Sequence, residues 1–267
     1  MRLFPALVPL VVFATGVASG GEPGYPEWRA QYEASLKAPD GWLSVAGLSW
    51  LREGANTVDI PSHKPIMLRL DGGRVSYEKR QLKSDITDHP DVLKFGDISL
   101  TIIERGGKLG VRLRDPNAET RREFTGCKWF PADPAWRINA RWISHPKPKM
   151  IAITNILVMT DQEPSPGYAE FTLQGKTMRL EPVLEDGELF FMFKDATSAK
   201  STYGAGRFLY AAVPKGSQSG LTTVELDFNK AHNPPCAFSA FATCPLPPKQ
   251  NILTAAIEAG EKSYGHH

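Results

Sequence analysis

Residues Ile98–Leu113 read ISLTIIERGGKLGVRL and predict a β-hairpin. In the first half, Ile98, Leu100 and Ile102 alternate with the other side chains, which is the two-residue period of a half-buried β-strand. The glycine-rich turn Arg105–Lys108 then separates this strand from a second apolar run. The stretch therefore favours an antiparallel β fold.

Short apolar runs broken by turn residues continue this pattern on both sides of the hairpin. Ile66–Leu70 and Val92–Phe95 are both followed by glycine and aspartate. Gly41–Gly54 is apolar but interrupted by glycine, which favours a buried strand with a turn at Ala46–Gly47 over a short helix. These spacings predict an N-terminal β-sandwich over residues 41–123.

The chain after residue 123 predicts a second β lobe, over residues 124–267. Glycine and proline, with 23 and 22 residues, favour many turns over long helices. Leu253–Lys262 fits either a final helix or a strand. We expect an antiparallel sandwich or a partly open barrel, so the predicted fold class is all-β in two lobes. The strand candidates of the second lobe are Ile138–Ile143, Met150–Ile156, Ala169–Leu173, Lys176–Leu180, Glu188–Phe193, Arg207–Val213 and Thr222–Phe228.

The N-terminus predicts a secretory signal peptide over residues 1–20. One arginine precedes an apolar run from Leu3 to Val17, and small residues follow it. The run is shorter than a membrane span, although a retained anchor is the alternative. We therefore expect export to the periplasm or the cell exterior, and no stable membrane insertion after the signal is removed.

Residues 21–40 are expected to form a helical strap. Trp28, Tyr32 and Leu36 recur at every fourth position of Pro26–Lys37, which places them on one helix face. Aromatic side chains on such a face usually pack against the body of a protein, so we expect the strap to lie on the sheets.

The charge balance and the missing motifs restrict the function. The formal net charge of +2 provides no basic stripe, so nucleic acid is not an expected partner. The sequence lacks a nucleophile elbow, a zinc-binding His-Glu-x-x-His motif and a phosphate loop. His63, His89 and His145 are expected in exposed loops, and Glu181–Glu188 is expected to form an exposed acidic hairpin. No cofactor, protein partner or catalytic residue is assigned.

A proline-rich loop over residues 229–251 carries two of the three cysteines. Its prolines fix φ and remove backbone donors, so we expect an irregular loop that packs on the second lobe and covers a cavity. In an oxidising compartment, Cys236 and Cys244 are expected to form a disulfide. A Cys–Cys–His metal site that adds His232 is the alternative. Cys127 is expected to be a buried lone thiol.

Polar side chains are concentrated in Phe193–Tyr210, between two predicted strands. If Arg207 points inward it must be paired or bind an anion, because an isolated buried charge is costly. Its guanidinium suits a carboxylate or a phosphate, and Asp195 is the nearest candidate partner. We therefore predict a ligand pocket beneath the cysteine-bearing loop. Its predicted lining residues are Arg137, Asp195, Tyr203, Arg207, Asn229, His232 and Asn233.

The same residues support three functional hypotheses. The favoured one is an exported protein that binds a small anionic or polar ligand in the second lobe, contacted by Arg207. The second is a hydrolase-type enzyme that uses an acid/base pair near Asp195, Tyr203 or His232. The third is a structural or interaction module without a pocket, in which Asp195 and Arg207 form a structural salt bridge.

The order of signals in the N-terminal lobe also resembles a forkhead-associated β-sandwich. Gly54–Val58 stands where such domains open with a glycine turn. Asp59-Ile60 and Ser62–Lys64 occupy the zone in which these domains carry their phosphothreonine-binding residues. The resemblance therefore implies the fold without phosphopeptide binding.

Five stretches together resemble a bacterial family known as domain of unknown function 1684. The family pattern has tyrosine where this chain has His232 and Phe241, which argues against a catalytic or a metal role for His232. The resemblance implies no activity. The matching stretches are Gly41–Gly54, Arg105–Asp115, Phe130–Arg137, Phe193–Tyr210 and Asp227–Pro248.

Overall fold

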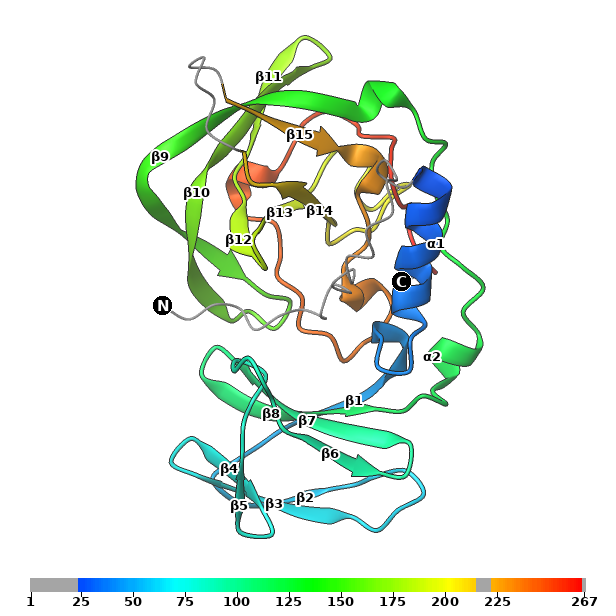
Figure 1. Ribbon diagram of the computed structural model, residues 1–267, viewed down its shortest axis with the longest axis vertical. Helices are drawn as coiled ribbons and strands as arrows, with labels where there is room; N and C mark the ends of the chain where they lie inside the picture. Colours follow the sequence, from blue (N-terminus) through cyan, green and yellow to red (C-terminus); the bar gives the residue numbers. More distant parts are fainter. Residues whose placement is uncertain (1–23, 215–221, 266–267) are drawn as a thin grey trace, which may run out of the picture. The chain divides into compact units, whose positions relative to one another are not determined.

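The computed structural model describes residues 24–214 and 222–265, and these divide into two compact units. The first contains residues 34–125 and 239–242, and the second contains residues 24–33, 126–238 and 243–265. Strands dominate both units (Figure 1), so the prediction of an all-β fold is confirmed. The predicted signal peptide lies outside the described residues. Within the described part of the chain, no helix is long and apolar enough to cross a bilayer.

The first unit is a sandwich of two four-stranded antiparallel sheets. Leu68 of one sheet and Leu100 and Ile102 of the other belong to one buried core, so the sheets pack face to face. The forkhead-associated topology stays a prediction. The sheets are β1 (Val45–Trp50), β8 (Lys108–Arg114), β7 (Ile98–Arg105) and β6 (Val92–Phe95), and β2 (Gly54–Val58), β3 (Ile66–Asp71), β4 (Arg74–Tyr77) and β5 (Arg80–Leu82).

Two local predictions for the first unit have different outcomes. The predicted hairpin is present, with Arg105 opposite Lys108 in the β7–β8 ladder. Gly106 and Gly107 both have positive φ, as a two-residue hairpin turn requires. The turn predicted at Ala46–Gly47 is wrong, because the chain continues through it as β1 with only a register shift between Val45 and Gly47.

The second unit is built from a four-stranded sheet and a three-stranded sheet. In Figure 1 the long strands β9 and β10 curve as a half-barrel beside the smaller sheet. Phe171 on β10 and Phe191 and Leu209 on the smaller sheet lie in one buried core. The sheets are β11 (Lys176–Leu180), β10 (Thr160–Leu173), β9 (Arg137–Thr154) and β15 (Thr223–Asp227), and β12 (Val183–Glu185), β13 (Glu188–Phe193) and β14 (Arg207–Ala212).

The strand boundaries predicted around the half-barrel are wrong. Ile138–Ile143 and Met150–Ile156 were expected as two strands, but β9 is continuous, and β10 begins at Thr160 instead of Ala169. Pro146 and Pro148 lie inside β9, and Pro164 and Pro166 lie inside β10. The ladder between β9 and β10 shifts register between Ser165 and Gly167, and such bulges accommodate proline within a sheet.

The helix and the irregular segments complete the second unit. Helix α1 (Tyr25–Leu36) confirms the helix predicted near the N-terminus, and its Trp28 and Tyr32 rings pack beside Trp129. Residues 252–262 form neither of the two predicted elements. They are extended, lie outside both sheets and bury alternate side chains: Leu253, Ala255, Ile257 and Ala259. The remaining 3₁₀ turns of the second unit are Pro134–Trp136, Phe228–Lys230, Pro235–Ala237 and Lys249–Asn251. The first unit contains the short helix α2 (Glu119–Arg122) and the 3₁₀ turn Trp42–Ser44.

Candidate functional site

Arg207 is the centre of a buried polar network in the second unit. Its Nη2 donates to Asp195 Oδ2 at 2.9 Å, and both side chains are 1% exposed. The guanidinium also donates to the carbonyls of Ile257, at 2.9 Å, and Ala259, so it holds the extended C-terminal segment. Asp195 additionally accepts hydrogen bonds from Thr197.

These contacts correspond to the structural-salt-bridge hypothesis. Burial lowers the pKa of Arg207, and the Asp195 carboxylate opposes that shift. The pairing of the two residues was expected from the sequence, but both terminal nitrogens of Arg207 are engaged by protein oxygens. A ligand-binding role for Arg207 stays a prediction.

The two asparagines predicted to line the pocket form hydrogen bonds with different neighbours. Asn229 Oδ1 accepts from Asp133 N at 3.0 Å, and its Nδ2 donates to Asp133 O at 2.9 Å. Asn229 thereby ties the loop to the segment before β9. Arg137, expected at the rim of the pocket, forms an exposed pair with Glu225 at 2.8 Å. Asn233 belongs to a separate cluster around Glu261.

Glu261 is a buried carboxylate that was not expected from the sequence. Its carboxylate is 0% exposed and accepts from Asn233 N at 2.7 Å and from Tyr32 Oη at 3.3 Å. Burial raises the pKa of Glu261 to about 7, and hydrogen bonds from Asn233, Cys127 and Tyr32 limit the rise. Tyr32 and Glu261 are 229 positions apart, so no local pattern reveals their contact.

His232 lies in an aromatic environment. Its ring stacks on Tyr210, with 6.0 Å between centroids, and lies 4.9 Å from Tyr32. Its Nδ1 is 3.1 Å from Lys230 O, and its backbone pairs with Phe208 beside Arg207. Burial lowers the pKa of His232 to about 4, despite the Lys230 carbonyl. The imidazole is therefore neutral at physiological pH.

Replacing His232 with phenylalanine is expected to remove an acid-sensitive contribution to stability. The folded-state pKa lies below the ordinary value of 6.5, so this contribution is present above pH 6.5 and is lost as pH falls toward 4. Between pH 7 and pH 5, the unfolding free energy of wild type should fall by about 2 kcal/mol more than that of the variant. Urea denaturation at the two pH values measures this. Parallel losses in both proteins would contradict it.

Tyr203 and the two loop cysteines form another group. Tyr203 Oη donates to Cys236 O at 3.2 Å, and Cys236 N donates to Cys244 Sγ at 3.0 Å. The structure records all three cysteines as thiols. In the part of the chain that is described, no group of three His, Cys, Asp or Glu side chains is arranged to hold a metal. The metal alternative for Cys236, Cys244 and His232 therefore has no support.

A second unforeseen acidic group lies along the half-barrel. Asp161 and Glu163 share one face of β10, and Glu185 ends β12. Tyr210, on β14, donates its hydroxyl to Glu185 Oε2 at 2.5 Å. We name Asp161, Glu163, Glu185 and Tyr210 the Glu163 cluster.

Glu163 differs from the other buried acidic residues because its carboxylate has no hydrogen-bond or ion-pair partner among residues 24–214 and 222–265, although the residue is only 4% exposed. Burial and the charges of Asp161 and Glu185 raise the pKa of Glu163 to about 7. No strand was predicted directly before Ala169, so a buried carboxylate at position 163 was not expected.

Two expectations about surface residues are wrong. His145 was expected in an exposed loop, and Glu181 in an exposed acidic hairpin. His145 instead lies within β9 with its Nε2 2.9 Å from Glu181 Oε1, and the Glu181 carboxylate also accepts from Lys149 and Gln250. His145, Lys149 and Gln250 satisfy the carboxylate of the 5%-exposed Glu181, which is a structural role.

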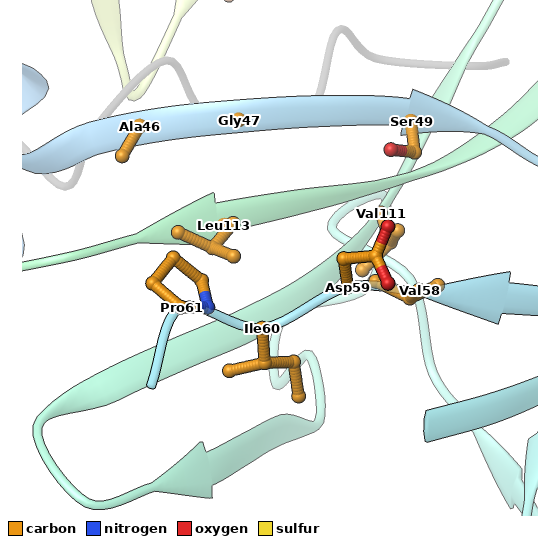
Figure 2. A pocket seen from close by; sticks show the side chains of 9 residues that line it. All are labelled: Ala46, Gly47, Ser49, Val58, Asp59, Ile60, Pro61, Val111 and Leu113. Atoms are coloured by element: carbon orange, nitrogen blue, oxygen red, sulfur yellow. The ribbon is translucent and has the colours of Figure 1, made fainter. Parts of the chain in front are cut away.

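Two pockets lie away from the predicted site residues. The first has a volume of about 320 Å³ and lies in the sandwich unit. Figure 2 shows Leu113, Pro61 and Ile60 at one end and the polar atoms of Ser49 and Asp59 at the other. The second, of about 450 Å³, lies in the second unit. It is lined by Thr177, Met178, Arg179, Gln250, Ile252, Leu253 and Thr254.

The fold and these contacts define an all-β protein whose second unit is organised around buried carboxylates. The chain belongs to the family described as protein of unknown function (DUF1684), whose model matches residues 122–262. It is also similar to the solution NMR structure of an uncharacterized protein of Haloarcula marismortui. The identity is 31%, the match covers 55% of this chain and 81% of that chain, and the TM-score is 0.45. No curated protein matches the chain.

Proposed function

We propose that the second unit binds a small polar ligand that carries a cationic group, and that the Glu163 cluster holds this group. The observation that carries the proposal is Glu163, a 4%-exposed residue whose carboxylate has no hydrogen-bond or ion-pair partner within residues 24–214 and 222–265. Burial of an unpaired carboxylate is costly, and its pKa of about 7 reflects that cost. An ammonium or guanidinium group would provide the missing charge and hydrogen-bond donors.

The neighbours of Glu163 favour a cation over an anion. Glu185 and Asp161 add negative charge on the same side, and these are the charges that act on Glu163. The Tyr210 ring stacks on Phe190 and His232, and its hydroxyl donates to Glu185, so it holds one carboxylate of the cluster in place. Together the three carboxylates provide the negative charge that a cationic group requires.

This proposal keeps the ligand in the lobe predicted from the sequence and changes the sign of its charge. The anionic ligand was inferred from Arg207, whose guanidinium donates to Asp195 and to main-chain carbonyls. The hydrolase hypothesis gains no support, because Asp195 and Tyr203 have separate partners and do not form an acid/base pair.

The test compares thermal unfolding and titration calorimetry with putrescine and agmatine at pH 8, where Glu163 is ionised. We expect both probes to raise the melting temperature of wild type, and Glu163→Gln to weaken binding about tenfold or more. Glu170→Gln is the matched control, because Glu170 lies on the same strand but pairs with Arg141 and Arg179. It should bind as wild type does.

Three outcomes would overturn the proposal. The first is no shift in melting temperature with either probe, and the second is an equal shift in wild type and Glu163→Gln. The third is a shift produced only by Ca²⁺ or Mg²⁺, since the proposed ligand is an organic cation.

A further inference from the structure

Cys236 and Cys244 are held close together by contacts on both sides. Cys236 lies in the 3₁₀ turn Pro235–Ala237, and its N–H donates to Cys244 Sγ at 3.0 Å. The Cys244 carbonyl accepts from Ile156 N at 3.0 Å, which anchors this cysteine after β9. The two sulfurs therefore belong to one built arrangement of the proline-rich loop.

The two thiols differ in access. Cys244 is fully buried, whereas Cys236 is half-buried. A reagent in solvent can therefore reach Cys236 first, and Cys244 is placed behind it. This asymmetry is typical of an attacking thiol and a resolving thiol.

The surroundings of Cys236 favour its thiolate. A hydrogen bond from the Cys244 side chain lowers the pKa of Cys236, and burial opposes it. Burial and the Glu261 carboxylate instead raise the pKa of Cys127. The surroundings therefore shift the pKa values of these two thiols in opposite directions.

We propose that Cys236 and Cys244 form a thiol–disulfide exchange site, with Cys236 as the attacking and Cys244 as the resolving cysteine. The Cys236 thiolate attacks one sulfur of a small disulfide, and the other sulfur leaves as a thiolate. Cys244, deprotonated, then attacks Cys236 Sγ and expels the second thiolate. The protein loses two protons and two electrons, and the small disulfide takes them up to become two thiols.

Oxidation at this site would close the loop between the two cysteines. Within that loop, Ser239 Oγ donates to Val45 O at 3.2 Å. A disulfide would limit the conformations that this loop can adopt in the unfolded chain.

The experiment incubates the full chain with oxidised glutathione and maps its thiols by peptide mass. Wild type should form an internal Cys236–Cys244 link and keep Cys127 reduced. Cys244→Ser should accumulate glutathione on Cys236, whereas Cys236→Ser should react about tenfold more slowly or not at all. Cys127→Ser is the matched control and should behave as wild type.

If a variant fails to fold, incubation of wild type with oxidised glutathione still tests the proposal. Three reduced thiols after incubation would overturn the proposal, as would a link that includes Cys127. A Cys236→Ser protein that takes up glutathione on Cys244 as fast as Cys244→Ser does on Cys236 would overturn the assigned roles.

Discussion

Arg207→Met is expected to lower the free energy of unfolding by about 3–5 kcal/mol. The change leaves the Asp195 carboxylate buried without its cation, and it removes the donor that satisfies the carbonyls of Ile257 and Ala259. Denaturant unfolding followed by circular dichroism measures the loss. Because the C-terminal segment depends on these bonds, the variant should also exchange the amide hydrogens of residues 252–261 faster than wild type.

The matched control is Arg137→Met. Arg137 pairs with Glu225 at a similar distance, 2.8 Å, but the two side chains are 41% and 42% exposed. An exposed pair of this kind contributes little to stability, because solvent screens the two charges. Combining Arg207→Met with Asp195→Leu should cost less than the sum of the two single changes, because the uncompensated charge is gone. If Arg207→Met is as mild as Arg137→Met, the buried network is not a major source of stability.

Glu163→Gln is expected to stabilise the protein in alkaline but not in acidic solution. The folded-state pKa of Glu163, about 7, lies above its ordinary value of 4.5. The contribution of this carboxyl to stability is therefore full below pH 4.5 and is lost as pH rises through 7. At pH 8 the variant should exceed wild type by about 2–3 kcal/mol, and near pH 4.5 the two should be similar. Urea denaturation at both pH values tests this.

Glu170→Gln distinguishes a local effect of Glu163 from a general effect of removing a negative charge. Hydrogen bonds from Arg141 and Arg179 lower the pKa of Glu170, so its contribution is complete above the ordinary pKa and does not change between pH 5 and 8. This variant should lose a little stability at both values. An equal gain for both variants at pH 8 would show that net charge, and not the surroundings of Glu163, controls the effect.

Local chemistry made part of the fold predictable. The β7–β8 hairpin follows from the alternation before Gly106 and Gly107, since both features lie within one short stretch. The helix carrying Trp28 and Tyr32 follows from its four-residue spacing. The pairing of Arg207 with Asp195 could also be expected, because the two residues flank one loop and an inward-pointing arginine requires a partner.

The rest depended on pairing between distant segments. No strand was predicted for residues 144–149 or 160–168, where the ladder between β9 and β10 continues. That ladder also places Glu163 on a buried face. Glu261 was missed because Tyr32 and Cys127 reach it from far away in the sequence. Periodicity carries no information about such contacts.

The bonds from Arg207 to the carbonyls of Ile257 and Ala259 also set an order of events during synthesis. While a ribosome still shields residue 259 in its exit tunnel, the arginine has Asp195 but not its main-chain acceptors. The hairpins of the sandwich, formed from much earlier residues, do not have to wait for them. The half-barrel therefore reaches its final packing only after residues 257–259 can pair with Arg207.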